Sequence, residues 1–466
     1  MNVNSQTGLV TRSSFARLFA VFQLAPPADF EITDTQQIAS GYRRWQRRVL
    51  ISAIIGYATF YFVRKNLSIA MPVMEHSLGI QKTQLGLFLT MHGLLYGVSK
   101  FANGFLGDRA NARVLMVSGL AMSAILNVLF GFSSTVIALG IIWTLNGWFQ
   151  GMGFPPCARL MSNWFSPKEL ATKFSLWNMS HPIGGGLIVV ICGYLVGFNW
   201  RLCFFVPAAL ALVCASFLWF TLPDTPPSVG LPEVDGTGII TGESSTGADQ
   251  PYGIPRKESS KEFRSFVYQY VFRNKYIWIV SFANFFVYII RYAVLDWGPT
   301  LLTESKHIKI AHAGWMVAGF EFFGLVGAVI GGWLTDKYFG GRAIRVCLIY
   351  MILAGVSVFL FWRLPAQSEL ATAALLGAAG FFIYGPQCLL AVAAANLATR
   401  KAAATAIGLT SIFGYASTVL SGWGLGALVQ HYGWNVAFEG LIIVAVFGSL
   451  LFALAWGAKV HGYAEG

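Results

Sequence analysis

The chain has 466 residues, of which 56% are hydrophobic and only 11% are charged. Soluble domains carry about 25% charged residues, so this composition excludes an ordinary soluble enzyme and indicates a surface that faces lipid. A net charge of +12 would suggest nucleic acid as the partner of a soluble protein. Here we expect no nucleic-acid partner, because the positive charges follow the loops of a membrane protein.

Twelve apolar stretches of sufficient length to cross a bilayer follow one another along the chain. A spanning helix needs about 20 mostly apolar residues. The predicted spans are 48–71, 83–106, 113–132, 136–158, 172–196, 201–222, 276–302, 312–335, 343–364, 369–397, 403–428 and 434–457. The chain is therefore predicted to be an all-α membrane protein.

A polar segment separates the sixth span from the seventh. It contains DTPPSVGLP and GESSTGADQPYG, and such a composition is typical of a linker. We therefore expect two pseudo-symmetric six-helix halves, 48–222 and 276–457, joined by a cytoplasmic linker at 223–275. Residues 1–47 and 458–466 are predicted to be a cytoplasmic N-terminal segment and tail.

Basic residues gather in alternate loops, which indicates the orientation in the membrane. One set of loops holds Arg43, Arg44, Arg47, Arg48, Arg109, Arg113, Lys168, Lys173, Arg256, Lys257, Lys261, Arg264, Arg273, Lys275, Lys337, Arg342, Arg345, Arg400 and Lys401. The other set holds only Lys82, Arg201, Lys306, Lys309 and Arg363. Since Lys and Arg are enriched in cytoplasmic loops, we expect a multi-pass protein of the bacterial inner membrane with both termini in the cytoplasm.

Six cysteines fall inside the predicted spans, without a CxxC pair or a regular spacing. We interpret them as apolar packing residues and not as a disulfide framework or metal site. They are Cys157, Cys192, Cys203, Cys214, Cys347 and Cys388.

A loop motif occurs twice, after the second span and after the eighth. The copies follow the pattern G-x-x-x-D-[RK], and their aspartates are 228 residues apart. A helix end with an acidic residue and a positive cluster is the alternative interpretation of one copy, whereas two copies in register indicate a duplicated transporter fold. The motif resembles the signature of the major facilitator superfamily, and this resemblance implies a role in gating for Gly104, Asp108, Arg109, Arg113, Gly332, Asp336 and Lys337.

Two arginines lie at equivalent depths in the first and seventh spans. Arg64 and Arg291 are 227 residues apart, and each follows a tyrosine by three residues, Tyr61 and Tyr288. An ionisable group inside a bilayer costs at least about 2.5 kcal/mol, so each arginine needs a partner or a function. Because guanidinium binds phosphate oxygens in a bidentate manner, we predict that the pair binds a phosphoryl group. The alternative is that each arginine pairs with Asp296, Glu321 or a backbone carbonyl.

Other polar residues inside the spans fit an anion site less specifically. His181 is either a donor to a phosphate oxygen or a buried histidine satisfied by a neighbour. Lys100 is either a site residue or a side chain that extends to the cytoplasmic interface, and the second is the stronger expectation. Hydroxyl donors for a central cavity are predicted at Tyr57, Tyr61, Tyr96, Tyr288, Tyr384 and Tyr415.

Seven segments resemble the organophosphate:phosphate antiporters of that superfamily. They are GYATFYFVRKNLSIAMP, YGVSKFANGFLGDRANAR, NGWFQGMGFPPCARLMSNWFSPKE, WNMSHPIGGG, VYIIRYAVLDWGPT, YGPQ and RKAAATAIGLTSIFGY. The resemblance implies that Arg64 and Arg291 bind phosphate and that His181 assists. It also implies positions in or beside the pore for Lys65, Lys100, Tyr57, Tyr61, Tyr96, Asn178, Tyr288, Tyr384 and Tyr415.

These features predict exchange of an organic phosphate, either a sugar phosphate such as hexose-6-phosphate or glycerol-3-phosphate, for inorganic phosphate. A membrane sensor of sugar phosphates and a proton-coupled symporter that uses Asp296, Glu321 or Glu439 are alternatives. No nucleophile with a base, metal-ligand cluster or G-x-x-x-x-G-K-[ST] loop stands out in the sequence. We therefore expect no enzyme activity, catalytic residue, metal or cofactor, and we expect a monomer.

Overall fold

The computed structural model describes residues 22–107, 110–233, 265–266, 268–365, 368–398 and 402–458. The regular structure of these residues is helical, and the one β-type contact among them is an isolated bridge between Gln23 and Ala110. The predicted all-α class is confirmed.

Six membrane crossings form each half. The first half consists of α2 (Thr35–Leu78), α3 (Lys82–Gly107), α4 (Ala112–Phe132), α5 (Val136–Gln150), α6 (Phe154–Trp164), α7 (Pro167–Asn178), α8 (Ser180–Leu195) and α9 (Leu202–Thr221). The second consists of α11 (Lys275–Ser305), α12 (Ile310–Phe339), α13 (Ala343–Arg363), α14 (Glu369–Leu397), α15 (Ala403–Ala416), the π-helix η4 (Val419–Gly424) and α16 (Leu425–Leu454). Between α9 and α11 lie the short helices η1 (Pro226–Val229) and η2 (Tyr268–Phe272).

Some crossings consist of two helices, and one helix contains parts of two crossings. Helices α5 and α6 share the fourth crossing, and α7 and α8 share the fifth. The eleventh crossing runs through α15, η4 and the start of α16. It ends at Gly433, whose φ of 78° and ψ of 178° break α16 before the twelfth crossing. By length and composition alone, 8 described helical segments qualify as spans. Helix α2 is not among them, and Arg64, Lys65 and Asn66 interrupt its apolar sequence.

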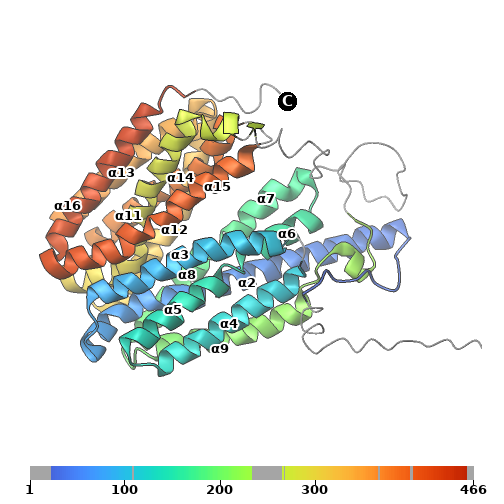
Figure 1. The fold of residues 1–466 in the computed structure, drawn as a ribbon, viewed down its shortest axis with the longest axis horizontal. Coiled ribbons are helices and arrows are strands. Elements are labelled where there is room, and N and C mark those ends of the chain that lie inside the picture. The colour runs from blue at the N-terminus through green and yellow to red at the C-terminus, as the bar shows by residue number, and fades with distance from the viewer. Residues whose placement is uncertain are drawn as a thin grey trace, which may run out of the picture.

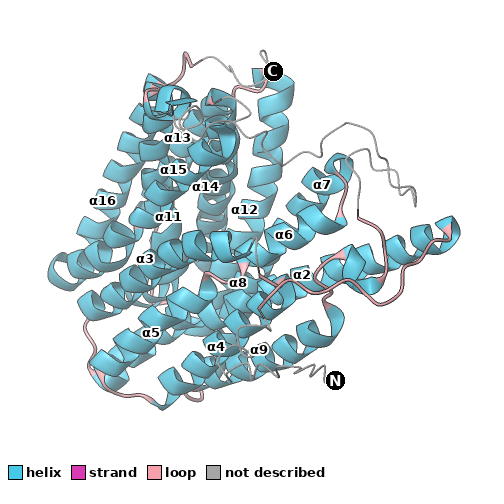
Figure 2. Ribbon diagram, turned by 45° about the vertical axis from the view of Figure 1, so that its right-hand side comes forward, coloured by secondary structure: helices cyan, strands magenta, loops and turns pink. Residues whose placement is uncertain are grey.

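Helix α2 begins well before its predicted span, which started at residue 48. Asp34 caps the helix by accepting a hydrogen bond of 2.9 Å from the backbone N–H of Gln36, an arrangement that favours a helix start at Thr35. The early turns of α2 project beyond the neighbouring helices (Figure 2). The crossing therefore continues a helix that starts outside the apolar stretch.

The two halves converge at one end of the molecule and diverge toward the end that carries the C-terminus (Figure 1). At the convergent end α3 packs against η4 and α16, while α8 packs against α12. Small residues permit this approach. The Cβ position of Gly314 lies 2.9 Å from the carbonyl oxygen of Val189, and that of Gly193 lies 3.4 Å from the Cα of Ala311. We call this end, where Lys82, Glu304 and Gln430 lie, the sealed end.

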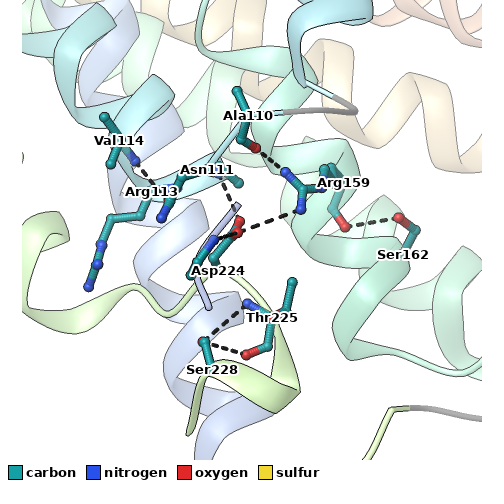
Figure 3. Close-up of polar contacts among 11 residues, drawn as sticks. Ala110, Asn111, Arg113, Val114, Arg159, Ser162, Asp224, Thr225 and Ser228 are labelled. Atoms are coloured by element: carbon teal, nitrogen blue, oxygen red, sulfur yellow. Dashed lines mark hydrogen bonds and ion pairs between the residues drawn. The ribbon is translucent and has the colours of Figure 1, made fainter. Parts of the chain in front are cut away.

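A buried carboxylate anchors the chain at the opposite end of the first half (Figure 3). The side chain of Asp224 is 0% exposed and accepts hydrogen bonds from the backbone N–H groups of Ala112, at 2.8 Å, and Ala25, at 3.1 Å. Arg159 lies 3.6 Å from it and donates to the carbonyl of Ala110. The loop between α3 and α4 and the beginning of the linker after α9 are thereby attached to each other within the first half.

The described N-terminal residues lie along this cluster. The N–H of Ala28 donates to Pro227 at 2.9 Å, and the N–H of Ile32 donates to Gly230 at 2.8 Å. On the other side, the N–H of Asn111 donates to Phe22 at 2.8 Å. Residues 22–32 thus join the loop before α4 to the segment after α9. We call residues 22–32 together with 224–231 the clasp.

Substitution of Asp224 by alanine is expected to destabilise the protein by about 3 kcal/mol, because it leaves buried N–H groups and a guanidinium without their carboxylate. The measurement is the free energy of unfolding of the purified protein in mixed detergent micelles. The control is Asp29→Asn, since Asp29 is exposed on the clasp. Equal stability of Asp224→Ala and wild type would show that the carboxylate does not hold the clasp.

Candidate functional site: a cationic and aromatic cluster between the halves

Arg64 on α2 and Arg291 on α11 each contact tyrosine rings at the middle of the molecule. The guanidinium of Arg64 lies 4.0 Å from the centroid of Tyr96 and 5.5 Å from that of Tyr61. That of Arg291 lies 4.9 Å from the centroid of Tyr384 and 5.8 Å from that of Tyr288. Each arginine therefore contacts the tyrosine three residues before it, as the helical spacing predicts.

Hydrogen bonding distinguishes Arg291 further. Its Nη2 donates to the hydroxyl oxygen of Tyr384 at 3.0 Å, and that hydroxyl donates to the carboxylate of Glu321. The residue is 5% exposed, and its Nε has no hydrogen-bond partner among the described residues. One donor of the guanidinium is therefore free for a ligand.

The nearby carboxylates have other partners. Asp296 on α11 pairs with Lys65 on α2 at 2.6 Å, and this ion pair joins the two halves. Within the described ranges, no ion pair links Arg64 or Arg291 to a carboxylate. The alternative of direct arginine–carboxylate pairing is thus wrong for Asp296, and Glu321 reaches Arg291 only through Tyr384.

The cluster carries more positive than negative charge. Its four basic side chains, Arg64, Arg291, Lys65 and Lys100, face two carboxylates, Asp296 and Glu321. Two positive charges are in excess. A charge buried without a partner is costly, so an anion that enters the cluster gains from this imbalance.

His181 lies beside Tyr61 and has a buried nitrogen without a hydrogen-bond partner among the described residues. The two rings stack with centroids 5.5 Å apart and planes 25° apart. In the described part of the chain Nδ1 of His181 has no hydrogen-bond partner. The alternative that a neighbour satisfies this nitrogen is therefore not supported.

Lys100 does not extend to the membrane interface, which corrects the stronger sequence expectation. Its ammonium donates to the hydroxyl of Tyr415 at 3.0 Å, across the two halves, and lies 3.9 Å from the ring of Phe154. Tyr415 in turn contacts Tyr96, with centroids 5.3 Å apart. The aromatic surroundings attract the cation inward.

The remaining predicted pore residues are Tyr57 and Asn178. Tyr57 packs on Trp177, with centroids 4.8 Å apart, and on Tyr61 at 5.7 Å. Asn178 is the last residue of α7, where the fifth crossing breaks, and is partly buried. Tyr292 was not predicted as a site residue, yet its ring lies 5.5 Å from the ammonium of Lys65. The same 227-residue offset that relates the arginines also relates Lys65 to Tyr292, so the repeat contained the signal.

The predicted gating residues lie apart from the arginines. Asp108 and Arg109 fall outside the described residues. Arg113 lies 5.3 Å from the ring of Trp219 within the first half. Gly104 and Gly332 have nothing within 4 Å of their Cβ positions, Asp336 is exposed, and Lys337 lies 4.8 Å from the ring of Trp333. None of these contacts joins the two halves.

The cysteines differ from the packing interpretation at one position. All six are free; five are buried, but Cys388 is exposed. Cys388 follows Tyr384 by four residues on α14, so it lies on the helix face that contacts Arg291, one turn further from the sealed end. The packing interpretation is therefore wrong for Cys388, whose thiol is exposed on the face of α14 that contacts Arg291.

The sealed end contains a second set of contacts between the halves. Lys82 at the start of α3 pairs with Glu75 of its own half and, at 3.0 Å, with Glu304 of the other half. The N–H of Lys82 donates to Gln430 at 2.9 Å, and Trp434 donates to Glu304 at 2.8 Å. These contacts connect α2, α3, α11 and α16.

Comparison with known proteins identifies the family. Residues 53–422 and 299–463 match the family model described as Major Facilitator Superfamily. The chain belongs to the major facilitator superfamily. The predicted fold of twelve transmembrane helices in two six-helix halves is confirmed, and this superfamily member is an integral membrane protein.

Several relatives align with nearly the whole length of this superfamily member. It is 36% identical to the glycerol-3-phosphate transporter of Bacillus subtilis and to a probable hexose phosphate transport protein of Chlamydia muridarum, over 94% of this chain and 97% of each relative. It is also 36% identical to the membrane sensor protein UhpC of Escherichia coli, over 92% of this chain and 96% of that protein. The resemblance to organophosphate transporters is confirmed.

Solved structures show the same fold at low identity. A bacterial homolog of the human lysosomal transporter Spinster, in an inward-facing and unoccupied conformation, has a TM-score of 0.68 at 15% identity, over 88% of this superfamily member and 95% of that chain. The nucleoside transporter NupG has a TM-score of 0.67 at 13% identity, over 88% and 99%.

Proposed function

We propose that the protein is a secondary transporter that exchanges an organic phosphate for inorganic phosphate by alternating access. The observation that carries this proposal is the pair Arg64 and Arg291, one from each half, in a cluster with two positive charges in excess. A phosphoryl dianion matches that excess, and it is the group that inorganic phosphate and organic phosphates share.

In this mechanism a phosphoryl group binds Arg64 and Arg291 together. Binding draws the two halves together and lowers the barrier to opening on the other side. The unpaired Nε of Arg291 and Nδ1 of His181 are donors for its oxygens. In an empty cluster the basic side chains of the two halves repel each other. Reorientation is therefore coupled to an occupied site, and exchange needs no ATP.

The distribution of basic loops supports an orientation with the termini in the cytoplasm of a bacterial inner membrane. With that orientation the sealed end faces away from the cytoplasm, and the conformation described above opens inward. We further propose that a monomer suffices, because both arginines come from one chain.

The relatives support an organic phosphate as the substrate, since their names include glycerol-3-phosphate and hexose phosphate. The test is uptake of radiolabelled phosphate into proteoliposomes that are preloaded with phosphate. Glucose-6-phosphate, glycerol-3-phosphate and 3-phosphoglycerate are added outside as competitors. We expect exchange, independent of a pH gradient, and the best competitor identifies the substrate.

A sensor is the second candidate, because a relative of equal identity is named a membrane sensor protein. The same experiment separates the two functions. Binding of glucose-6-phosphate without any phosphate exchange would favour the sensor. Exchange that requires a pH gradient would instead favour a proton-coupled symporter.

A further inference from the structure

A pocket lies in the second half, far from the sealed end, where α13 begins and α14 and α16 end. Its lining includes Arg342 and Arg345 at the start of α13, Asn396 on α14 and Trp456 after α16. None of the lining residues is acidic. The pocket is therefore positively charged, and it lies at the end of the helices, where the bilayer surface is expected.

Arg345 has unused binding capacity in this pocket. Its guanidinium lies 5.0 Å from the ring of Trp456, which holds the side chain across the pocket. Within the described residues its Nε is buried and has no hydrogen-bond partner. Arg342 is exposed, and no side chain caps the N-terminus of α13 that follows it. The two guanidinium groups thus supply the positive charge of the pocket, since the negative ends of α14 and α16 offset the positive end of the α13 dipole there.

Apolar surface adjoins the pocket along the same helices. Helices α13 and α16 pack against each other. Exposed apolar side chains follow on α13 at Ile349 and Ile352 and precede the pocket on α16 at Leu450 and Leu454. A tryptophan at the bilayer surface and a basic pocket between helices are features that bind lipid headgroups. A free phosphate ion would use the arginines but not this apolar surface.

We propose that this pocket binds the phosphate headgroup of an anionic phospholipid whose acyl chains lie along α13 and α16. The headgroup phosphate accepts hydrogen bonds from Arg342 and Arg345, and the ring of Trp456 lies at the level of the glycerol. The site is separate from the arginine pair between the halves, and it does not depend on the proposed exchange function.

The test is native mass spectrometry of the delipidated full-length protein, titrated with palmitoyl-oleoyl phosphatidylglycerol or with the phosphatidylcholine of the same chains. We expect the wild type to bind the first phosphatidylglycerol more tightly than phosphatidylcholine. Because each surface arginine contributes about 1 kcal/mol to binding an anionic lipid, about five-fold in affinity, Arg342→Gln should lose about five-fold. Arg342→Gln with Arg345→Gln should lose about 25-fold.

Arg363→Gln is the matched control. Arg363 lies at the other end of α13 and also contacts a tryptophan, Trp362, at 4.9 Å, but there the helix dipole opposes an anion. We expect this variant to bind phosphatidylglycerol as the wild type does. Arg342→Gln changes only an exposed residue, so its result stands even if the double variant is unstable.

Two outcomes would overturn the proposal. One is equal affinity of the wild type and both pocket variants for phosphatidylglycerol. The other is displacement of the first phosphatidylglycerol from the wild type by millimolar inorganic phosphate but not by equimolar chloride, which would assign the pocket to the free ion. None of these measurements involves transport, so a failure here leaves the exchange proposal untouched, and the reverse also holds.

Discussion

Lysine in place of Arg64 or Arg291 is expected to lower phosphate exchange about 100-fold while the protein remains folded. Lysine keeps the charge but loses the planar fork that binds two phosphate oxygens at once. Loss of one charge-assisted hydrogen bond costs about 1.5–3 kcal/mol, and about 2.7 kcal/mol corresponds to 100-fold. In addition, Arg291→Lys removes the donor to Tyr384, so Glu321 loses its connection to the cation.

The measurement is the initial rate of labelled phosphate exchange in proteoliposomes with equal amounts of each variant. Arg363→Lys serves as the control, because Arg363 lies at the end of α13, on the loop side, and has no contact with the cluster in the described structure. Wild-type rates for both Arg64→Lys and Arg291→Lys would show that the phosphoryl group does not bridge the arginines. A loss in only one variant would assign binding to one half.

Glutamine in place of Glu304 is expected to open the sealed end. Glu304 is the carboxylate of the other half that Lys82 contacts, and Trp434 donates to it as well. Its loss leaves the ammonium of Lys82 with Glu75 alone, within one half. Breaking a partly buried pair of this kind shifts the equilibrium between the two conformations by about 1.4 kcal/mol, a factor of ten.

Cys388 provides a native reporter of that shift. It is the exposed cysteine among the six, and it lies near the arginine cluster on the side away from the sealed end. In alternating access, opening of the sealed end closes the opposite side, from which Cys388 is reached. In inside-out membrane vesicles, a membrane-impermeant maleimide should therefore modify Cys388 more slowly in Glu304→Gln than in the wild type. The Cys388→Ser variant gives the background from the five buried thiols.

The matched control for this experiment is Glu369→Gln. Glu369 pairs with His312 at 3.0 Å, and their side chains are 52% and 53% exposed within the second half. An exposed pair inside one half contributes little and does not join the halves. Equal labelling of Glu304→Gln and Glu369→Gln would contradict a gating role for the Lys82 contacts.

The fold was predictable because its signals are local and repeated. Apolar length defines a crossing, and the 228-residue repeat of the loop motif defines the two halves. The boundaries were less accessible. The break at residues 151–153 lies inside an apolar stretch, and the start of α2 at Thr35 depends on a polar cap outside the membrane.

The candidate site was predictable to the level of which residues gather. Repeat symmetry indicated Arg64 and Arg291 with their tyrosines, and in the structure each arginine contacts its own tyrosine. Partner choice was not predictable. Whether Asp296 pairs with Lys65 or with an arginine depends on the packing of α2 against α11, which no local pattern encodes. The inward position of Lys100 likewise depends on Tyr415, which is 315 residues away.

The clasp has a practical consequence for tagging and shortening the chain. A fluorescent protein fused before Phe22 leaves every described contact of residues 22–32 in place. A shortened chain that starts at Thr35 would remove the backbone donor of Ala25 from Asp224 and the donors of Ala28 and Ile32 from the segment after α9. Fusions at this end of the chain, for imaging or purification, therefore belong ahead of Phe22.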